Sequence, residues 1–163
     1  QFENKANVAV HKENTAKEIL EQVQKPIHGF CSGIGTGGKI TGIAEALKEV
    51  YQNIEVWAVE PENAAILSNK EIKTHIQMGI GDGIIPDILN QEIIDECCMI
   101  SDEEAVATAR ELALKEGILC GISSGTNVAA ARKLAKKLGK GKTVVTILPD
   151  TAERYFSTPL FEE

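Results

Sequence analysis

The feature that most constrains the fold of this chain is a glycine-rich segment, GFCSGIGTGGKITG at residues 29–42. Residues 26–32 have the composition of a short buried strand, and residues 39–50 place apolar side chains at helical spacing. A strand that passes through a glycine loop into a helix gathers several backbone amides and a helix N-terminus around one point. The segment therefore predicts an anion site, with a tight turn that holds no ligand as the alternative.

The rest of the chain alternates between strand and helix patterns. We expect further strands at 54–61, 95–100 and 142–150, and further helices at 14–23, 101–117 and 126–139. Near-continuous apolar strands that alternate with helices are typical of a parallel sheet flanked by helices, a doubly wound, Rossmann-like α/β fold. The length of 163 residues, with 43% hydrophobic but only 4% aromatic residues, suits one domain with an aliphatic core.

Local signals place some of the helix ends. Thr15 with Glu18, and Ser101 with Glu104, have the spacing of capping boxes, and Gly117 stands where a glycine would stop a helix. The last predicted strand, rich in β-branched residues, is expected to be buried.

Charge and cysteine content exclude several classes of function. The net charge of −7 argues against nucleic acid as the main partner. No apolar run approaches the roughly 20 residues that span a bilayer, and the first residues lack the pattern of a signal peptide. The four cysteines lack metal-site spacing, so we expect reduced, packed thiols, no metal and a cytoplasmic location.

The glycine segment also fits most of a P-loop, G-x-x-x-x-G-K-[ST], from Gly33 to Lys39. The hydroxyl residue that would hold magnesium is replaced by Ile40, and Thr41 comes one position late. On a helix, one position turns a side chain by about 100°. The P-loop interpretation is therefore disfavoured.

A dinucleotide fingerprint, G-x-G-x-x-G, also fits Gly33, Gly35 and Gly38. Glu60, at the end of the next strand, stands where an acid would bind the ribose hydroxyls. Because Pro61 follows, Glu60 is equally well placed at a strand end without a ligand. This interpretation stays open, although no hydride-transfer residues are evident.

Several segments together resemble one family. The segments QFEN, GIGTGGKITG, AVEPE, GIGDGIIP, EGILCGISSG and LPDTAERYFST occur in the order found in cysteine synthase, also called O-acetylserine sulfhydrylase. These are fold-type II pyridoxal-phosphate enzymes related to cystathionine β-synthase and tryptophan synthase β. The resemblance covers essentially the whole chain and corresponds to the C-terminal portion of the family, which implies a partial tryptophan-synthase-β-like fold.

The resemblance assigns the cofactor phosphate to a loop that is usually G-T-G-G-T in the family. Here its residues are Gly35, Thr36, Gly37, Gly38 and Lys39. Backbone amides and the Thr36 hydroxyl are expected to bind the phosphate of pyridoxal 5′-phosphate. Lys39 departs from the usual threonine, so one hydroxyl is lost and one cation is gained.

The resemblance also assigns the other end of the cofactor and the substrate. Ser123 corresponds to the residue that hydrogen-bonds the pyridine nitrogen, and a neutral hydroxyl there leaves the nitrogen largely unprotonated. Ser124 is expected to cap the next helix. Gly79 and Gln1 correspond to substrate-binding positions, and Gln1 to one near the α-carboxylate. Asp150 lies in the segment that walls the ring end, and it is the alternative partner of the ring nitrogen.

The family's catalytic lysine, which forms a Schiff base with the cofactor, lies in a motif like S-x-K-D-R before QFEN, and the sequence contains no such motif. We therefore expect residues 1–163 to be a single domain, the C-terminal large-domain part of a two-domain enzyme, and to be inactive alone. For the intact protein the resemblance implies cysteine biosynthesis, in which O-acetylserine and sulfide give cysteine and acetate.

Two alternatives remain at the level of sequence. One is an enzyme like cystathionine β-synthase, and the other is a non-catalytic module that binds a phosphate or a nucleotide. The resemblance further implies a homodimer for the intact enzyme and a cleft that accepts the C-terminal tail of serine acetyltransferase.

Overall fold

The central feature of the computed structural model, which describes residues 1–68 and 71–161, is a parallel sheet. Strand β1 pairs with β2 and with β4, and β2 pairs with β3, so the order is β3-β2-β1-β4. The bounds of the strands are β1 Gly29–Gly33, β2 Glu55–Pro61, β3 Glu96–Ile100 and β4 Val144–Thr146. This arrangement confirms the predicted α/β fold class.

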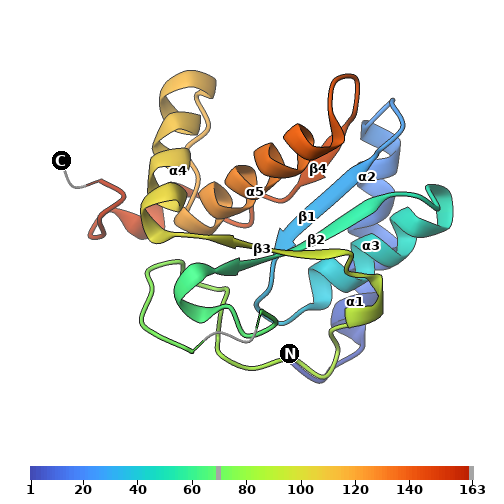
Figure 1. Cartoon of the computed structure of the whole chain (residues 1–163), viewed down its shortest axis with the longest axis horizontal. Helices are drawn as coiled ribbons and strands as arrows, with labels where there is room; N and C mark the ends of the chain where they lie inside the picture. The colour runs from blue at the N-terminus through green and yellow to red at the C-terminus, as the bar shows by residue number, and fades with distance from the viewer. Residues whose placement is uncertain (69–70, 162–163) are drawn as a thin grey trace.

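Helices cover both faces of the sheet (Figure 1). One face carries α1 (Ala6–Val10), α2 (Ala16–Gln22) and α3 (Gly38–Val50), and the other carries α4 (Asp102–Glu116) and α5 (Ile122–Leu138). A separate apolar core lies on each face. Short helical segments complete the description: a π-helix at His11–Thr15, and 3₁₀ turns at Glu62–Ala64, Gln91–Ile93 and Ala152–Tyr155.

The strand order creates a crevice between β1 and β4. The chain moves outward from β1 through β2 to β3 and then returns, through α4 and α5, to place β4 on the other side of β1. The loops that follow β1 and β4 therefore diverge toward opposite faces. In open α/β sheets this switch point, at the carboxyl ends of the strands, is where ligands bind.

The predicted ends of α4 are confirmed. The Ser101 hydroxyl accepts the backbone amide of Glu104 at 3.2 Å, as an N-cap does. Gly117 ends the helix with φ of 68°, in the left-handed region where glycine is favoured.

The predicted capping box at Thr15 is wrong. Helical backbone already begins at Ala6, whose amide donates to the side chain of Asn4 at 2.9 Å. Thr15 therefore lies within continuous helix, in the π-helical turn, and its hydroxyl lies 3.0 Å from the ring of His11. The tertiary contact replaces the cap that the local pattern favours.

Two other predicted boundaries also move. Helix α5 begins four residues earlier than its apolar pattern indicates, with Gly121 as N-cap, so Ser124 lies inside the first turn and the capping role predicted for it is wrong. Strand β4 covers only Val144–Thr146, and its residues are half-buried, not buried as expected. Among the described strands β4 pairs on one side only, which leaves its other edge without a ladder.

The thiols are free, and three of them are buried as predicted: Cys31, Cys98 and Cys120. Burial raises the pKa of Cys31 to about 12. No helix in the described part of the chain is long and apolar enough to cross a bilayer.

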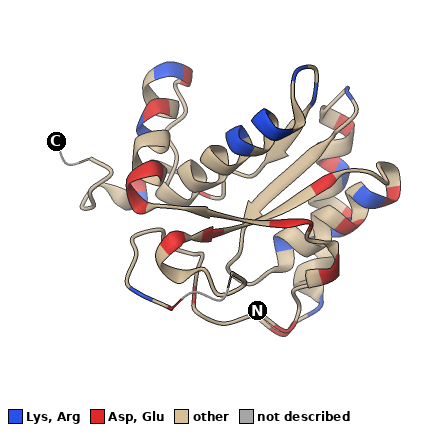
Figure 2. Ribbon diagram, viewed as in Figure 1, with Lys and Arg blue, Asp and Glu red and all other residues tan. Residues whose placement is uncertain are grey.

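Basic side chains follow the exposed side of α5 (Figure 2). Lys133 pairs with Glu104 of α4 at 2.8 Å, and Lys137 pairs with Glu96 of β3 at 2.7 Å. These contacts tie the outer surface of α5 to its two neighbours.

Candidate functional site

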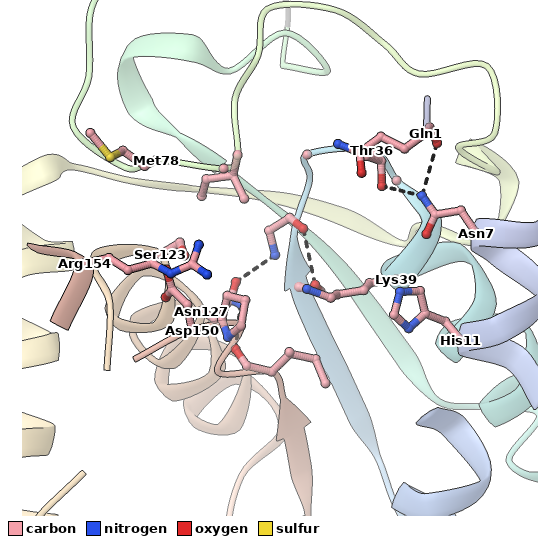
Figure 3. Close-up of a pocket in the computed structure, with 18 residues that line it drawn as sticks. Gln1, Asn7, His11, Thr36, Lys39, Met78, Ser123, Asn127, Asp150 and Arg154 are labelled. Atoms are coloured by element: carbon pink, nitrogen blue, oxygen red, sulfur yellow. Dashed lines mark hydrogen bonds between the residues drawn. The ribbon is translucent and has the colours of Figure 1, made fainter. Parts of the chain in front are cut away.

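A cavity of about 360 Å³ opens at the crevice between β1 and β4. Its walls come from the loop after β1, the loop after β4, the first turns of α5, and a segment around Gly79. The N-terminal residues and the π-helical turn close one side. Figure 3 shows Lys39 and His11 on one side of this cavity, across from Ser123, Asp150 and Arg154.

The loop after β1 presents free backbone amides. Within residues 1–68 and 71–161, no protein acceptor pairs with the amides of Gly35, Thr36 and Gly37, and the same holds for Lys39. The amide of Gly38 makes one long contact, 3.4 Å, to the Thr36 hydroxyl. Gly37 caps helix α3 with φ of 79°. Unpaired amides at a helix N-terminus form the donor set that a phosphate group requires.

Thr36 is held in place by the N-terminal residues. Its hydroxyl accepts a hydrogen bond from the Asn7 side chain at 3.0 Å, and the same Asn7 amide contacts the backbone oxygen of Gln1 at 3.1 Å. Since both contacts of the Thr36 hydroxyl use its oxygen as acceptor, its proton remains available to a ligand.

Two basic side chains, Lys39 and His11, line the end of the cavity that the amide loop forms. Lys39, on the first turn of α3, lines the cavity and has no ion pair within the described residues. Burial, with a smaller effect from the charge of Lys39, lowers the pKa of His11, so this imidazole is neutral at pH 7. Among the described side chains that line this end of the cavity, Lys39 therefore carries the formal positive charge.

The opposite end carries a hydroxyl and a carboxylate. Ser123, on the first turn of α5, is buried to 3% exposure and lines the cavity. Asp150 follows β4 and lines it too, with one carboxylate oxygen accepting the Tyr155 hydroxyl at 2.6 Å. Burial first, and then this hydrogen bond and the charge of Asp150, raise the pKa of Tyr155.

A single asparagine joins the two strands that form the crevice. Asn127 accepts the backbone amide of Gly33, at the end of β1, at 2.7 Å. It donates to the backbone oxygen of Ile147, just after β4, also at 2.7 Å. Because both of its polar atoms are used, Asn127 fixes the separation of the loops that form the cavity walls.

Thr126, next to Asn127 on α5, supports the cavity wall that the segment around Gly79 forms. The Thr126 hydroxyl donates to the side chain of Gln77 at 2.8 Å, and Gln77 donates in turn to Ile100 and Asp102 at 3.0 and 2.8 Å. Gln77 is fully buried and directly precedes the glycine-rich segment that contains Gly79. This network sets the position of that segment at the mouth of the cavity.

The segment that contains Gly79 lies directly against the amide loop. The amide of Gly81 donates to Ile34 at 2.9 Å, and a Cβ on Gly35 would overlap the backbone oxygen of Gly79. Position 35 therefore requires glycine, because the backbones of the two segments approach each other closely there.

The structure does not support the dinucleotide or the P-loop interpretation, because the residue that each requires is engaged elsewhere in the fold. Glu60 uses both carboxylate oxygens internally, for the Leu67 amide at 2.8 Å and the Ser68 hydroxyl at 2.9 Å, and it does not line the cavity. The buried Thr41 hydroxyl contacts Ile88 and Asn90 at 3.4 and 3.1 Å. Neither the ribose ligand of a dinucleotide site nor the magnesium ligand of a P-loop is available.

Seven of the eight predicted site residues line this one cavity: Gln1, Gly35, Thr36, Gly37, Lys39, Gly79 and Ser123. The eighth, Gly38, lies buried behind them. The lining residues that were not predicted as ligand contacts include Asn7, His11, Asn127 and Arg154. Asn7 and Asn127 act through contacts 29 and 94 residues away in the chain, which no local pattern reveals.

The fold and the cavity define a class: an α/β fold whose switch point presents unpaired amides suited to an anionic ligand. The family described as pyridoxal-phosphate dependent enzyme matches residues 1–150, and the chain belongs to it. The amide loop fits the phosphate of that cofactor, and Ser123 at the other end fits its ring.

Cysteine synthases are similar over nearly the whole chain. Cysteine synthase from Staphylococcus aureus (strain Mu50) is 49% identical over 162 residues, which cover 99% of this chain and 52% of the relative. Cysteine synthase B from Campylobacter jejuni is 50% identical, with coverage of 99% and 53%. The chain therefore spans about half the length of the curated relatives it matches.

Solved structures of related enzymes are also similar to this chain over nearly its whole length. O-acetyl serine sulfhydrylase isoform 3 from Entamoeba histolytica superposes with a TM-score of 0.96 at 41% identity, over 100% of this chain and 49% of that one. The O-acetylserine dependent cystathionine beta-synthase from Helicobacter pylori gives 0.94 at 40% identity, over 99% and 52%. These neighbours confirm the resemblance found in the sequence.

Proposed function

We propose that this chain supplies the cofactor-phosphate half of a pyridoxal-phosphate-dependent cysteine synthase. One observation carries the proposal: the residues with unpaired amides, Gly35, Thr36, Gly37 and Lys39, line the same cavity as Ser123. The cofactor, when bound, withdraws electrons from the amino acid and so makes its β-substituent labile. The whole enzyme would replace the acetate of O-acetylserine with sulfide, because the curated relatives described above are cysteine synthases.

The residues of this chain bind and orient. The amides and the Thr36 hydroxyl would hold the phosphate by hydrogen bonds to a charged acceptor, which are about twice as strong as neutral ones. Lys39 would add a charge that threonine does not supply. Gln1 and Gly79 would border the amino-acid substrate, and Asn127 would keep the walls of the cavity at a fixed separation.

We propose that residues 1–163 alone form one domain and are catalytically inert, because no lysine of the family's catalytic motif occurs in the sequence. The assay is cysteine formation from O-acetylserine and sulfide by the purified 163-residue chain. Turnover above the rate of free pyridoxal phosphate would contradict inertness.

Binding is tested separately by calorimetric titration with pyridoxal phosphate, pyridoxal and NAD. We expect pyridoxal phosphate to bind at least about tenfold more tightly than pyridoxal, since only the former carries the anion for the amide loop. Lys39→Thr should retain binding but reduce its dependence on salt, while the matched variant Lys140→Thr, on the exposed turn after α5, should change neither. Tighter binding of NAD than of pyridoxal phosphate would refute the proposal.

A further inference from the structure

His75 lies just before the glycine-rich mouth of the cavity, and both of its ring nitrogens make contacts with the backbone. The amide of Gln77 donates to Nδ1 at 3.2 Å, and Nε2 lies 3.2 Å from the backbone oxygen of Gly81. A backbone N–H can only donate, and a carbonyl oxygen can only accept. One neutral tautomer therefore satisfies both contacts: Nδ1 is unprotonated, and Nε2 carries the proton and donates it to Gly81.

The two contacts enclose residues 77–81, which we call the mouth segment. Its first residue, Gln77, is fully buried, and its last, Gly81, donates its amide to Ile34, just after β1, at 2.9 Å. Gly79 and Gly81 have φ values of 82° and 71°. Glycine loses more conformational freedom on folding than any other residue. Contacts at both ends are therefore needed to hold the mouth segment in one conformation.

Close packing connects the imidazole of His75 to the amide loop. A Cβ on Gly81 would lie 3.0 Å from His75 Nε2 and 2.7 Å from Pro61 Cγ, so Gly81 lies directly against both rings. The backbone oxygen of Gly79 lies so close to Gly35 that a Cβ there would overlap it. A shift of the imidazole would therefore move Gly81 and, with it, the backbone that lies against the amide loop.

We propose that His75, in its Nε2–H tautomer, is a positioning residue that fixes the mouth segment against the amide loop. The inference rests on the proposed function and deepens it, because it names the side chain that holds Gly79, the predicted substrate border, in place. His75 is not among the described residues that line the cavity, so it acts through Gln77 and Gly81. Apparent affinity falls with the fraction of molecules in the binding-competent conformation. Loss of these contacts should therefore weaken binding although every ligand contact remains.

The tautomer is tested first, in the parent chain without ligand, by NMR of the ¹⁵N-labelled imidazole at pH 7.5. We expect His75 to carry its proton on Nε2, with Nδ1 unprotonated. A proton on Nδ1 would overturn the inference, because the Gln77 amide would then face another donor. This measurement requires neither a variant nor the cofactor.

Two uncharged variants then separate the contacts of His75. The side-chain nitrogen in His75→Gln can occupy the position of Nε2 and donate to Gly81, whereas His75→Asn is too short to do so. Hydrogen exchange of the Gly81 amide, which donates to Ile34, reports local opening, and the amides of β2 report global unfolding. We expect the Gly81 amide to exchange about fivefold faster in His75→Asn, the factor that one hydrogen bond contributes, and at nearly the parent rate in His75→Gln. Parent-like exchange of Gly81 in His75→Asn, or an equal acceleration in β2, would overturn the inference.

His28→Gln is the matched control. Nδ1 of His28 also accepts a backbone amide, that of Thr143 at 3.2 Å, but at the opposite ends of β1 and β4. Exchange at Gly81 should be unchanged in this variant, and faster exchange would show that the effect is not specific to the mouth segment.

Titration with pyridoxal phosphate relates the contacts of His75 to binding. We expect about fivefold weaker binding by His75→Asn than by the parent chain, with His75→Gln close to the parent. Failure of the parent chain to bind contradicts the proposed function and leaves the tautomer and exchange results to decide the role of His75. Faster exchange at Gly81 with parent-like affinity overturns the connection between His75 and the site.

Discussion

The side-chain oxygen of Asn127 accepts the backbone amide of Gly33 at 2.7 Å, and this contact joins α5 to the end of β1 inside the wall of the cavity. Asn127→Ala should lower the free energy of unfolding by about 2 kcal/mol, because it leaves a buried amide and a carbonyl without partners. Urea unfolding measures the change. Asn14→Ala, which removes an exposed side-chain contact within a helix, is the matched control and should have little effect. Equal effects of the two variants would show that the bridge contributes nothing.

Gly37→Ala should destabilise the chain by about 2 kcal/mol or more and weaken binding of pyridoxal phosphate. Its φ is 79°, and an added Cβ would lie 2.9 Å from Leu89 Cβ. Gly117→Ala is the matched control, since φ is 68° and no atom lies within 4 Å of its added Cβ. The control should cost about 1 kcal/mol for backbone strain alone, with binding unchanged. A smaller loss at Gly37 than at Gly117 in thermal unfolding would mean that the contact with Leu89 imposes no cost.

Ser101→Ala should cost about 1 kcal/mol, because the hydroxyl caps α4 by accepting the Glu104 amide. Thr15→Ala should cost less, although its sequence pattern is the same, because Thr15 makes no capping hydrogen bond. Paired chemical denaturation of the two variants measures the difference. A larger loss at Thr15 would mean that the helix begins where the local pattern indicates.

Glu111 provides a pH-dependent contribution to stability. Hydrogen bonds from Lys115 and then Arg132 lower its pKa from 4.5 to about 2. Because the folded pKa is the lower one, the contribution is complete above pH 4.5 and is lost as the pH falls toward 2. Glu111→Gln should therefore show a shallower decline of stability over that range than the parent chain. Parallel curves would indicate that these exposed contacts are screened by solvent.

The sequence predicts those parts of the fold that depend on local chemistry. The strand, glycine loop and helix around Gly37 follow from backbone geometry, and the ends of α4 follow from Ser101 and Gly117. The site residues that sequence motifs indicate also lie around one cavity, because the carboxyl ends of parallel strands share one edge.

Long-range contacts explain what the sequence could not predict. Thr15 does not cap a helix, because helical backbone already begins at Ala6. Helix α5 begins earlier than its pattern indicates, because buried contacts from Ile122 onward favour helix over loop. The role of Asn127 depends on two strands that are far apart in the chain. Such contacts leave no periodic pattern.

The first two turns of α5 hold Ser123 at one end of the cavity, anchor the glycine-rich mouth through Thr126, and join β1 to β4 through Asn127. A rotation of this helix would shift all three boundaries at once. The two ends and the entrance of the cavity thus share one support, so a substitution deep in α5 would alter the geometry of every wall together.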